Sequence, residues 1–491
     1  MRLLLCLVPL LTLFHGTAEA EEAPFERRDL QTEHPIVQDA VPVRLGDDEA
    51  RHLLVVTSPD RKRVVVELFA PDAQGVPAGP PRRLSLPDDV VAFDVARSGA
   101  DGRETVYFLT PRELLRLDPD TAALRRVRDV RSIYRRPVPG RLLTPNFLRD
   151  VDGSAPLLVL PDFDGVHVGR NFLPVAPRTL HDERGPAYHP AAIGLQDLDL
   201  DGRVDAFLIS EDALHVFRGR DSSFSEVALV QPLRLGIGRD PAEGDLGEVD
   251  QSDLTTRRVV AIEDFDGDER IDLLIESQHR SGVLDRKTSL DLHLGHGGSS
   301  GVSWSVQPTT SIGAEGPLGD LRVVDIDGDG RRDVAAGSID FGIGTLVSAL
   351  LTGSVDIDVL FFRLGEDGHY PEQPSATREA EIEFDLSKGQ ASIPVVLLAD
   401  TDGDGDRDLV VREEQDELRV YPADGSGDLF ADSPQKAAVP LPNNGQLVAR
   451  ADLNGDARDD LLVRYGHLDG GEAKRRLVLL LGRAPGAPKI S

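Results

Sequence analysis

The feature that most constrains this chain is a short Asp-rich unit that recurs eight times along its 491 residues. The clearest copies read VVDIDGDGRRDV at 323–334 and LADTDGDGDRDL at 398–409. A single unit of this size cannot bury its own apolar residues, so neighbouring units must stack and share a core. The repeat therefore predicts one repetitive architecture.

Five of the eight copies keep acidic or amide side chains at positions 1, 3, 5 and 9 of the unit. They are Asp197, Asp199, Asp201 and Asp205; Asp264, Asp266, Asp268 and Asp272; Asp325, Asp327, Asp329 and Asp333; Asp400, Asp402, Asp404 and Asp408; and Asp452, Asn454, Asp456 and Asp460. Three worn copies, at 46–48, 101–102 and 150–153, keep the flanking apolar segments but lose acidic residues.

Aliphatic segments precede and follow each copy, as VVAI does at 259–262 and DLLI at 272–275. Short apolar segments bounded by turn residues are typical of strands, and their continuous apolarity indicates sheets that are covered on both faces. Further strand candidates lie between the copies, at 213–217, 290–294 and 417–421. Each repeat thus contains about four strands.

Sheets with exposed edge strands tend to pair with other chains. A β-propeller avoids this by packing four-stranded sheets radially around an axis, which leaves only short, protected edges. We predict an all-β propeller of four-stranded blades with metal-binding hairpin loops. Eight blades are favoured, and seven is the alternative if one worn copy is not a blade. After Asp460 only two strands remain, at 461–464 and 476–481, so N-terminal strands near Ile36 and at 41–45 are expected to complete the last sheet.

The interval between Asp333 and Asp400 is longer than the others. It contains the sequence FGIG at 341–344 and an acidic stretch at 370–383. We expect this interval to form a long loop or an inserted strand pair, a common location for a binding surface.

The spacing of the acidic residues predicts calcium sites. Carboxylates at positions 1, 3 and 5 of a tight loop point to one centre, the backbone carbonyl at position 7 adds a ligand, and Asp at position 9 closes the site. Oxygen ligands in this number suit Ca²⁺ at ~2.3 to 2.6 Å, whereas zinc prefers His or Cys. We expect up to about five Ca²⁺ ions. For the worn copies, ordinary Asp/Gly hairpin turns are the preferred interpretation.

The competing interpretation of such a loop is an EF-hand, which needs flanking helices and a bidentate Glu at position 12. In the five strong copies, position 12 is an aliphatic residue inside a strand-like segment: Leu208, Ile275, Ala336, Val411 and Val463. The loops are therefore predicted to lie in β-hairpins.

Over nearly all of the mature chain, the repeat resembles the FG-GAP/VCBS repeats of integrin-α-type β-propellers. Residues 325–334 match the motif D-x-D-G-D-G-x-x-D-[LV] fully. The resemblance implies that the loops bind Ca²⁺, join neighbouring strands of a blade, and belong to a protein of adhesion or ligand binding. Leu200 at position 4, and Glu269 and Ala457 at position 6, replace glycine where positive φ is expected, which leaves the occupancy of those three loops open.

The charge balance limits the partners. Lys plus Arg number 54 against 85 Asp plus Glu, a net charge of −31. Such a surface repels nucleic acid and anionic membranes and attracts cations. The short basic runs at 61–63 and 474–476 are interpreted as solvated strand faces or turns.

The N-terminus predicts export. Arg2, an apolar stretch at 3–14 and the small-residue pattern at 18–20 indicate a signal peptide over residues 1–20. The apolar stretch is shorter than the ~20 residues that span a bilayer, and no later segment is long enough. We expect a secreted, periplasmic or cell-surface protein with an N-terminal extension at 21–33, the propeller at 34–485 and a tail at 486–491. Cys6, the one cysteine, lies in the signal segment.

No Ser/His/Asp signature, zinc-protease motif or phosphate-binding loop is present. His293 and His296 are interpreted as ordinary polar surface residues. We predict a non-enzymatic binding, adhesion or scaffold module with an unidentified protein or polysaccharide ligand. The alternative is a carbohydrate-active lyase or hydrolase with structural calcium. A deep axial pocket with converging carboxylates outside the metal loops would favour the enzyme.

Overall fold

A computed structural model describes residues 23–483, apart from 47–48, 98–101, 137, 152–155, 163–164, 175–192, 211–212, 222, 240–253, 281–285, 317, 339–351, 386–389, 415 and 425–428. The predicted signal peptide at 1–20 and C-terminal tail at 486–491 lie outside these residues. No helix in the described part of the chain has the length and apolarity needed to cross a membrane.

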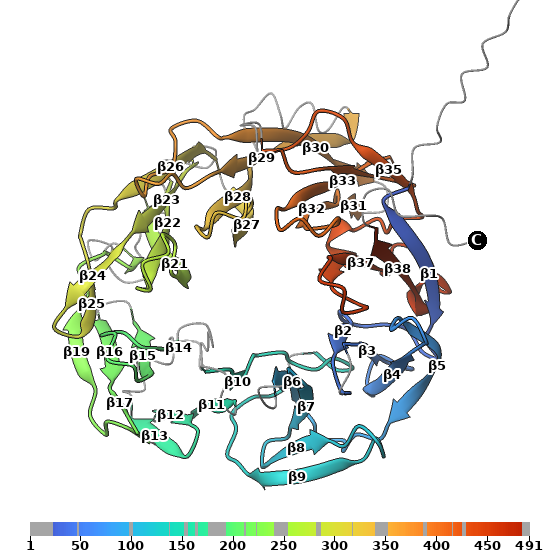
Figure 1. Ribbon diagram of the computed structural model, residues 1–491, viewed down its shortest axis with the longest axis horizontal. Helices are drawn as coiled ribbons and strands as arrows, with labels where there is room; N and C mark the ends of the chain where they lie inside the picture. Colours follow the sequence, from blue (N-terminus) through green and yellow to red (C-terminus); the bar gives the residue numbers. More distant parts are fainter. Residues whose placement is uncertain are drawn as a thin grey trace, which may run out of the picture.

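Eight antiparallel sheets stand side by side in a closed ring (Figure 1). Blade 1 contains β2 (Val41–Val43), β3 (His52–Thr57), β4 (Val65–Pro71) and β5 (Pro77–Leu84), and blade 2 contains β6 (Ala92–Arg97), β7 (Glu104–Leu109), β8 (Glu113–Leu117) and β9 (Leu124–Asp129). Blade 3 contains β10 (Leu148–Arg149), β11 (Leu157–Asp162), β12 (Gly165–Val168) and β13 (Asn171–Pro174), and blade 4 contains β14 (Ile193–Gln196), β15 (Asp205–Ile209), β16 (Ala213–Phe217) and β19 (Leu229–Pro232).

Blade 5 contains β20 (Gly238–Arg239), β21 (Leu254–Glu263), β22 (Asp272–Arg280), β23 (Arg286–His293) and β26 (Thr310–Glu315), and blade 6 contains β27 (Leu318–Val324), β28 (Asp333–Ser338), β29 (Ser354–Phe362), β30 (Ala376–Asp385) and β31 (Gln390–Ser392). Blade 7 contains β32 (Val396–Ala399), β33 (Asp408–Glu414), β34 (Glu417–Tyr421) and β35 (Gln435–Ala438), and blade 8 contains β36 (Val448–Ala451), β37 (Asp460–Arg464), β38 (Arg476–Gly482) and β1 (Phe25–Gln31). Two small hairpins, β17 (Gly219–Arg220) with β18 (Ser223–Phe224) and β24 (Gly295–Gly298) with β25 (Gly301–Trp304), lie outside the blades.

The eight-bladed, all-β prediction is confirmed, and the seven-bladed alternative is set aside. The strand candidates at 213–217 and 417–421 coincide with β16 and β34. Residues 290–293 of the candidate at 290–294 are the second half of β23, and Leu294 follows the end of the strand.

The N-terminal strand closes the ring, but it is not the strand that was predicted. β1 lies beside β38 (Figure 1) and pairs with it antiparallel. Phe25 lies opposite Gly482, and Gln31 lies opposite Arg476. The prediction of closure near Ile36 and at 41–45 was therefore wrong, because β2 opens blade 1 and Ile36 forms an isolated bridge to Thr57. The closing strand lies in the stretch expected as an N-terminal extension.

The interval between Asp333 and Asp400 also differs from expectation. Most of the acidic stretch at 370–383 belongs to β30, which pairs with β29 along eight residues as the fourth strand of blade 6. β31 then adds a fifth strand. Residues 376–383 are thus part of the blade, whereas residues 370–375 lie in the connection from β29 to β30, and residues 341–344 lie outside the described residues.

The core consists of apolar clusters that lie between neighbouring blades. Along β22, Leu273 and Ile275 pack into the cluster shared with blade 4, whereas Leu274 packs into the cluster shared with blade 6. Side chains alternate between the two faces of a strand, so a strand covered on both faces must be apolar at every position. This explains the continuous aliphatic segments after each Asp-rich unit.

Candidate metal centres

The five strong Asp-rich units form five loops of one geometry, and each loop joins two neighbouring strands of its blade: β14 to β15, β21 to β22, β27 to β28, β32 to β33 and β36 to β37. They belong to blades 4 to 8. Positions 4 and 6 have positive φ in every loop: Leu200 and Gly202, Gly267 and Glu269, Gly328 and Gly330, Gly403 and Gly405, and Gly455 and Ala457. The three residues that replace glycine therefore keep the left-handed conformation that the motif requires.

The carboxylate at position 1 holds the loop in shape by accepting hydrogen bonds from backbone N–H groups inside the loop. The N–H of Gly403 donates to Oδ1 of Asp400 at 2.7 Å, and the N–H of Gly405 donates to Oδ2 at 3.1 Å. Asp264 accepts in the same way from Gly267 and Glu269. The positive φ at positions 4 and 6 turns these N–H groups inward.

Four of the loops bring three carboxylates together, with one oxygen of each within 4.8 Å of the other two. The groups are Asp197, Asp199 and Asp201; Asp264, Asp266 and Asp272; Asp325, Asp327 and Asp333; and Asp400, Asp402 and Asp404. In the fifth loop, Asn454 Nδ2 donates a 2.9 Å hydrogen bond to Asp456 Oδ2. The third carboxylate comes from position 9 in the loops at 264 and 325, and from position 5 in the loops at 197 and 400.

The loop at 325 contains buried acceptors without a donor. Oδ1 of Asp325 and Oδ1 of Asp327 are inaccessible to solvent and accept no hydrogen bond from the described residues. Burial raises the pKa of Asp327, and the neighbouring Asp329 raises it further. A hard cation would satisfy both oxygens, and the all-oxygen ligand set fits Ca²⁺ rather than zinc.

Asp at position 9 has a second role that the spacing alone does not indicate. Asp333 is fully buried, and its Oδ2 accepts from the N–H of Ile326 at 2.9 Å while its Oδ1 accepts from Leu364 at 2.9 Å. Asp272 and Asp460 accept equivalent pairs of bonds. Burial raises the pKa of each of these three carboxyls to about 7.

Position 7 carries an arginine in four of the five loops, which the sequence interpretation missed. Arg203, Arg331 and Arg458 each pair with the Asp at position 5 of their own loop. These arginines neutralise part of the acidic charge without a metal. The exception is the loop at 400, where Asp406 occupies position 7 and adds a further carboxylate.

Consecutive loops are hydrogen-bonded to one another around the ring. The N–H of Arg332 donates to the carbonyl of Phe265 at 2.9 Å, and the N–H of Arg407 donates to that of Ile326 at 2.8 Å. The N–H of Asp459 continues the series by donating to the carbonyl of Asp400 at 2.6 Å. The loops of blades 5 to 8 therefore form one connected rim.

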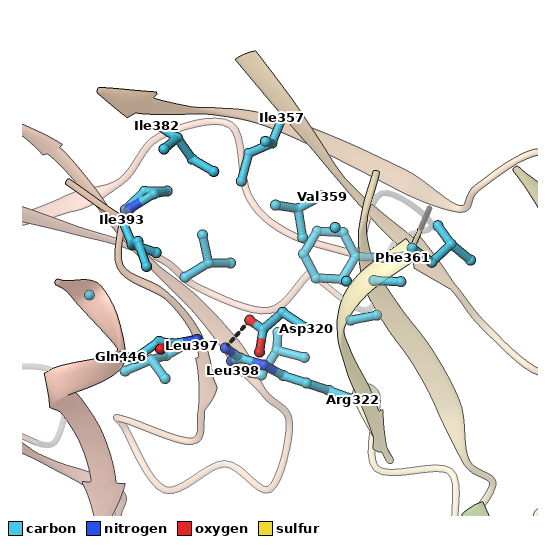
Figure 2. A pocket seen from close by; sticks show the side chains of 18 of the residues that line it. Asp320, Arg322, Ile357, Val359, Phe361, Ile382, Ile393, Leu397, Leu398 and Gln446 are labelled. Atoms are coloured by element: carbon cyan, nitrogen blue, oxygen red, sulfur yellow. Dashed lines mark hydrogen bonds and ion pairs between the residues drawn. The ribbon is translucent and has the colours of Figure 1, made fainter. Parts of the chain in front are cut away.

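A separate cavity of about 490 Å³ lies between blades 6 and 7 (Figure 2). Aliphatic side chains line most of it, among them Ile357, Ile382 and Leu397. Asp320 is the one acidic residue among its described lining residues, and it pairs with Arg322 at 2.6 Å. The cavity is an apolar chamber rather than a convergence of carboxylates.

The two histidines do not form a metal pair among the described residues. His293 is buried, contrary to the prediction of a surface residue, and its Nδ1 lies 2.9 Å from the carbonyl oxygen of Ser305. Burial lowers its pKa. His296 is exposed on β24.

Eight antiparallel sheets of four or five strands in a closed ring, five of them with an Asp-rich loop between neighbouring strands, define an eight-bladed β-propeller. Residues 400–463 match the family model of the FG-GAP-like repeat. This segment starts at Asp400, the first residue of one loop, and runs through the next loop into β37. The chain is therefore a β-propeller that contains an FG-GAP-like repeat at 400–463.

The solved structures that match this chain have low sequence identity to it. The biofilm matrix protein Bap1 of V. cholerae is 11% identical, with 95% of this chain and 92% of that chain covered and a TM-score of 0.40. The exotype rhamnogalacturonan lyase YesX is 14% identical over 62% of this chain and 55% of that chain, with a TM-score of 0.26. The WD40 domain of SCAP from fission yeast is 10% identical over 79% and 92%, with a TM-score of 0.29. No curated protein matches the sequence. Similarity at this level carries no information about function.

Proposed function

We propose that this chain is an exported calcium-binding β-propeller that acts as a non-enzymatic binding, adhesion or scaffold module. Calcium stiffens the Asp-rich loops and contributes to folding because it binds only the native loop geometry. The observation that carries the proposal is the loop at 325, where buried carboxylate oxygens of Asp325 and Asp327 accept no hydrogen bond from the described residues.

The residues that would hold the ions are the carboxylates at positions 1, 3, 5 and 9. The ion supplies positive charge at a point where three acidic side chains of one loop converge. The loops at 325 and 400 are the strongest candidates, because both have glycine at positions 4 and 6. The loop at 452 is the weakest, since Asn454 replaces one carboxylate and Arg458 pairs with another.

The alternative function, a carbohydrate-active enzyme, has no specific support in the described residues. General acid–base cleavage of a glycosidic bond needs two carboxyl groups on either side of the bond. Among its described lining residues, the cavity between blades 6 and 7 has Asp320 as its one carboxylate, and Arg322 already neutralises this group. A binding module with structural calcium is therefore favoured.

Calcium titration of the metal-stripped protein by isothermal calorimetry tests the proposal. We expect about four or five bound Ca²⁺ per chain and much weaker binding of Mg²⁺, which needs a smaller and more regular octahedron. The variant Asp327→Asn should bind one ion fewer, whereas Asp221→Asn, at an exposed turn outside the loops, should bind as many as the parent. If the titration gave the same number of bound Ca²⁺ ions for the parent and for Asp327→Asn, the proposal would be contradicted.

Export is tested separately. Expression of the full chain in a bacterium should yield a protein in the periplasm or medium whose N-terminus is Glu21. An intact N-terminus on a cytoplasmic protein would contradict the export proposal without affecting the calcium proposal.

A further inference from the structure

The two ends of each blade carry different connections. In a four-stranded antiparallel meander, the turn between the first and second strands lies at one end of the sheet, and the crossover from the fourth strand to the next blade lies at the other. We call the second end the crossover face. On this face, blades 1 and 2 carry a set of cations that we call the arginine cluster: Arg61, Lys62, Arg63, Arg112, Arg131, Arg135, Arg136 and Arg141.

Backbone hydrogen bonds bring the cluster together from separate segments. The crossover from β9 to β10 begins beside the β7–β8 turn, where the N–H of Val130 donates to the carbonyl of Arg112 at 2.9 Å. Further along, Arg136 donates from Nε to the carbonyl of Val90 at 2.6 Å and from Nη2 to that of Asp88 at 2.8 Å. The crossover is thereby fixed across the end of blade 2.

The same crossover then meets the turn between β3 and β4. A Cβ atom at Gly140, which has φ +81°, would lie 2.9 Å from the backbone carbonyl group of Arg61, so the two segments touch. The N–H of Leu142 donates to the side-chain oxygen of Gln38 at 2.9 Å and holds the crossover against blade 1. Arg61, Lys62 and Arg141 therefore lie at or next to this contact between the two segments.

Few of these cations are neutralised by the described residues. Arg63 pairs with Asp60 at 2.9 Å, and Arg131 lies 3.5 Å from Asp162. The remaining six form no ion pair in the part of the chain that the structure describes, and the guanidinium groups of Arg135 and Arg136 donate only to backbone carbonyls. Asp88 and Asp89 are the acidic residues of the adjoining crossover. The cluster keeps an excess of positive charge on a chain of net charge −31.

We propose that the arginine cluster binds an anionic polysaccharide that carries carboxylate groups. Arginine forks match carboxylates through paired hydrogen bonds, and the spread of the cluster over two blades suits an extended polymer rather than a single small anion. This inference rests on the proposed role as a binding module, and it does not depend on metal occupancy.

Carboxylated polysaccharide is favoured over nucleic acid for two reasons. A duplex carries one charge per ~1.7 Å, so the acidic remainder of the protein repels it more strongly than a polymer with one charge per sugar. Single strands bind through aromatic side chains that stack on bases. In the described part of the crossover from β9 to β10, both aromatic side chains, Tyr134 and Phe147, are buried.

Binding of the full-length protein to immobilised polygalacturonate, measured by biolayer interferometry with calcium present, tests the inference. The parent should bind with an affinity that falls as salt rises. Arg61→Gln combined with Arg141→Gln should weaken binding about tenfold, since each exposed charge contributes a modest amount. These two side chains make no hydrogen bond or ion pair within the described residues, so folding should be preserved, as circular dichroism can check.

The matched control is Arg97→Gln combined with Arg220→Gln, which removes the same charge from exposed arginines outside the cluster. It should bind as the parent does. Equal loss in both double variants, tighter binding to duplex or single-stranded DNA than to polygalacturonate, or absence of parent binding at low salt would each overturn the inference. None of these outcomes bears on the calcium titration, so the two proposals fail separately.

Discussion

The backbone N–H of Leu364 donates a 2.9 Å hydrogen bond to Oδ1 of Asp333, and this bond joins the end of β29 to the start of β28. The other oxygen of Asp333 accepts from Ile326 inside the loop. One buried carboxylate therefore connects three segments of blade 6, whether or not a metal is bound.

Replacing this residue should destabilise the protein even in EDTA. Asp333→Ala leaves two buried N–H groups without acceptors, which should lower the free energy of unfolding by about 3 kcal/mol. Asp329→Ala in the same loop is the control and should cost about 1 kcal/mol or less, because the pair with Arg331 is partly exposed. Urea unfolding of both variants in EDTA measures the difference, and equal losses would show that position 9 serves the metal alone.

Backbone conformation at positions 4 and 6 gives a second prediction. Ala457 has φ +66°, so Ala457→Gly should raise the free energy of unfolding by about 1 kcal/mol. Gly330 has φ +88°, and a Cβ there would meet no atom within 4 Å, so Gly330→Ala should lower stability by a similar amount through strain alone. Thermal unfolding of the two variants checks both signs, and a stabilising Gly330→Ala would refute the shared loop geometry.

Ring closure through β1 gives a third prediction. Leu30 is buried, lies opposite Leu477, and packs in the core between blades 8 and 1. Leu30→Ala should lower the free energy of unfolding by about 3 kcal/mol, whereas the exposed neighbour Gln31→Ala should have little effect. If residues 21–33 were a loose extension, both variants would unfold at the same urea concentration as the parent.

A fourth prediction concerns pH. Burial raises the pKa of Asp94 from 3.8 to about 6, although its carboxylate accepts hydrogen bonds from Leu148 and Val95. A carboxyl group whose pKa is higher in the folded state stabilises the folded protein fully at pH values below its unfolded-state pKa. This stabilisation is lost as the pH rises through the folded-state pKa. The parent should therefore lose up to about 3 kcal/mol relative to Asp94→Asn between about pH 4 and pH 7. Urea unfolding across this range measures the difference, and a difference independent of pH would contradict the assignment.

The sequence predicted the blades and loops well because their signals are local. The buried Leu418 and Val420 alternate with half-buried residues along β34, so the segment from Glu417 to Tyr421 could be located to the residue. β1 was missed because its sequence, FERRDLQ, has four charged residues among seven and only two buried side chains. An outer strand that is half exposed leaves little apolar pattern to detect.

Other features of the site depend on packing or on comparison between loops. The arginine at position 7 could have been found by aligning the five units, since Arg203, Arg270, Arg331 and Arg458 share that position. The hydrogen bonds of Asp333 to Leu364 and the cavity beside Asp320 could not have been found in this way, because residues distant in sequence form them.

The central claim is that calcium in the Asp-rich loops stabilises the propeller, and thermal unfolding of the full-length protein in EDTA, Ca²⁺ or Mg²⁺ tests it most directly. We predict that Ca²⁺ raises the unfolding midpoint well above the EDTA value and that Mg²⁺ does so much less. The double variant Asp327→Asn with Asp402→Asn, which keeps side-chain shape but removes one charge from each loop, should lose much of the gain. An unfolding midpoint that is the same in EDTA and in Ca²⁺ would contradict the claim and identify the loops as hairpin turns.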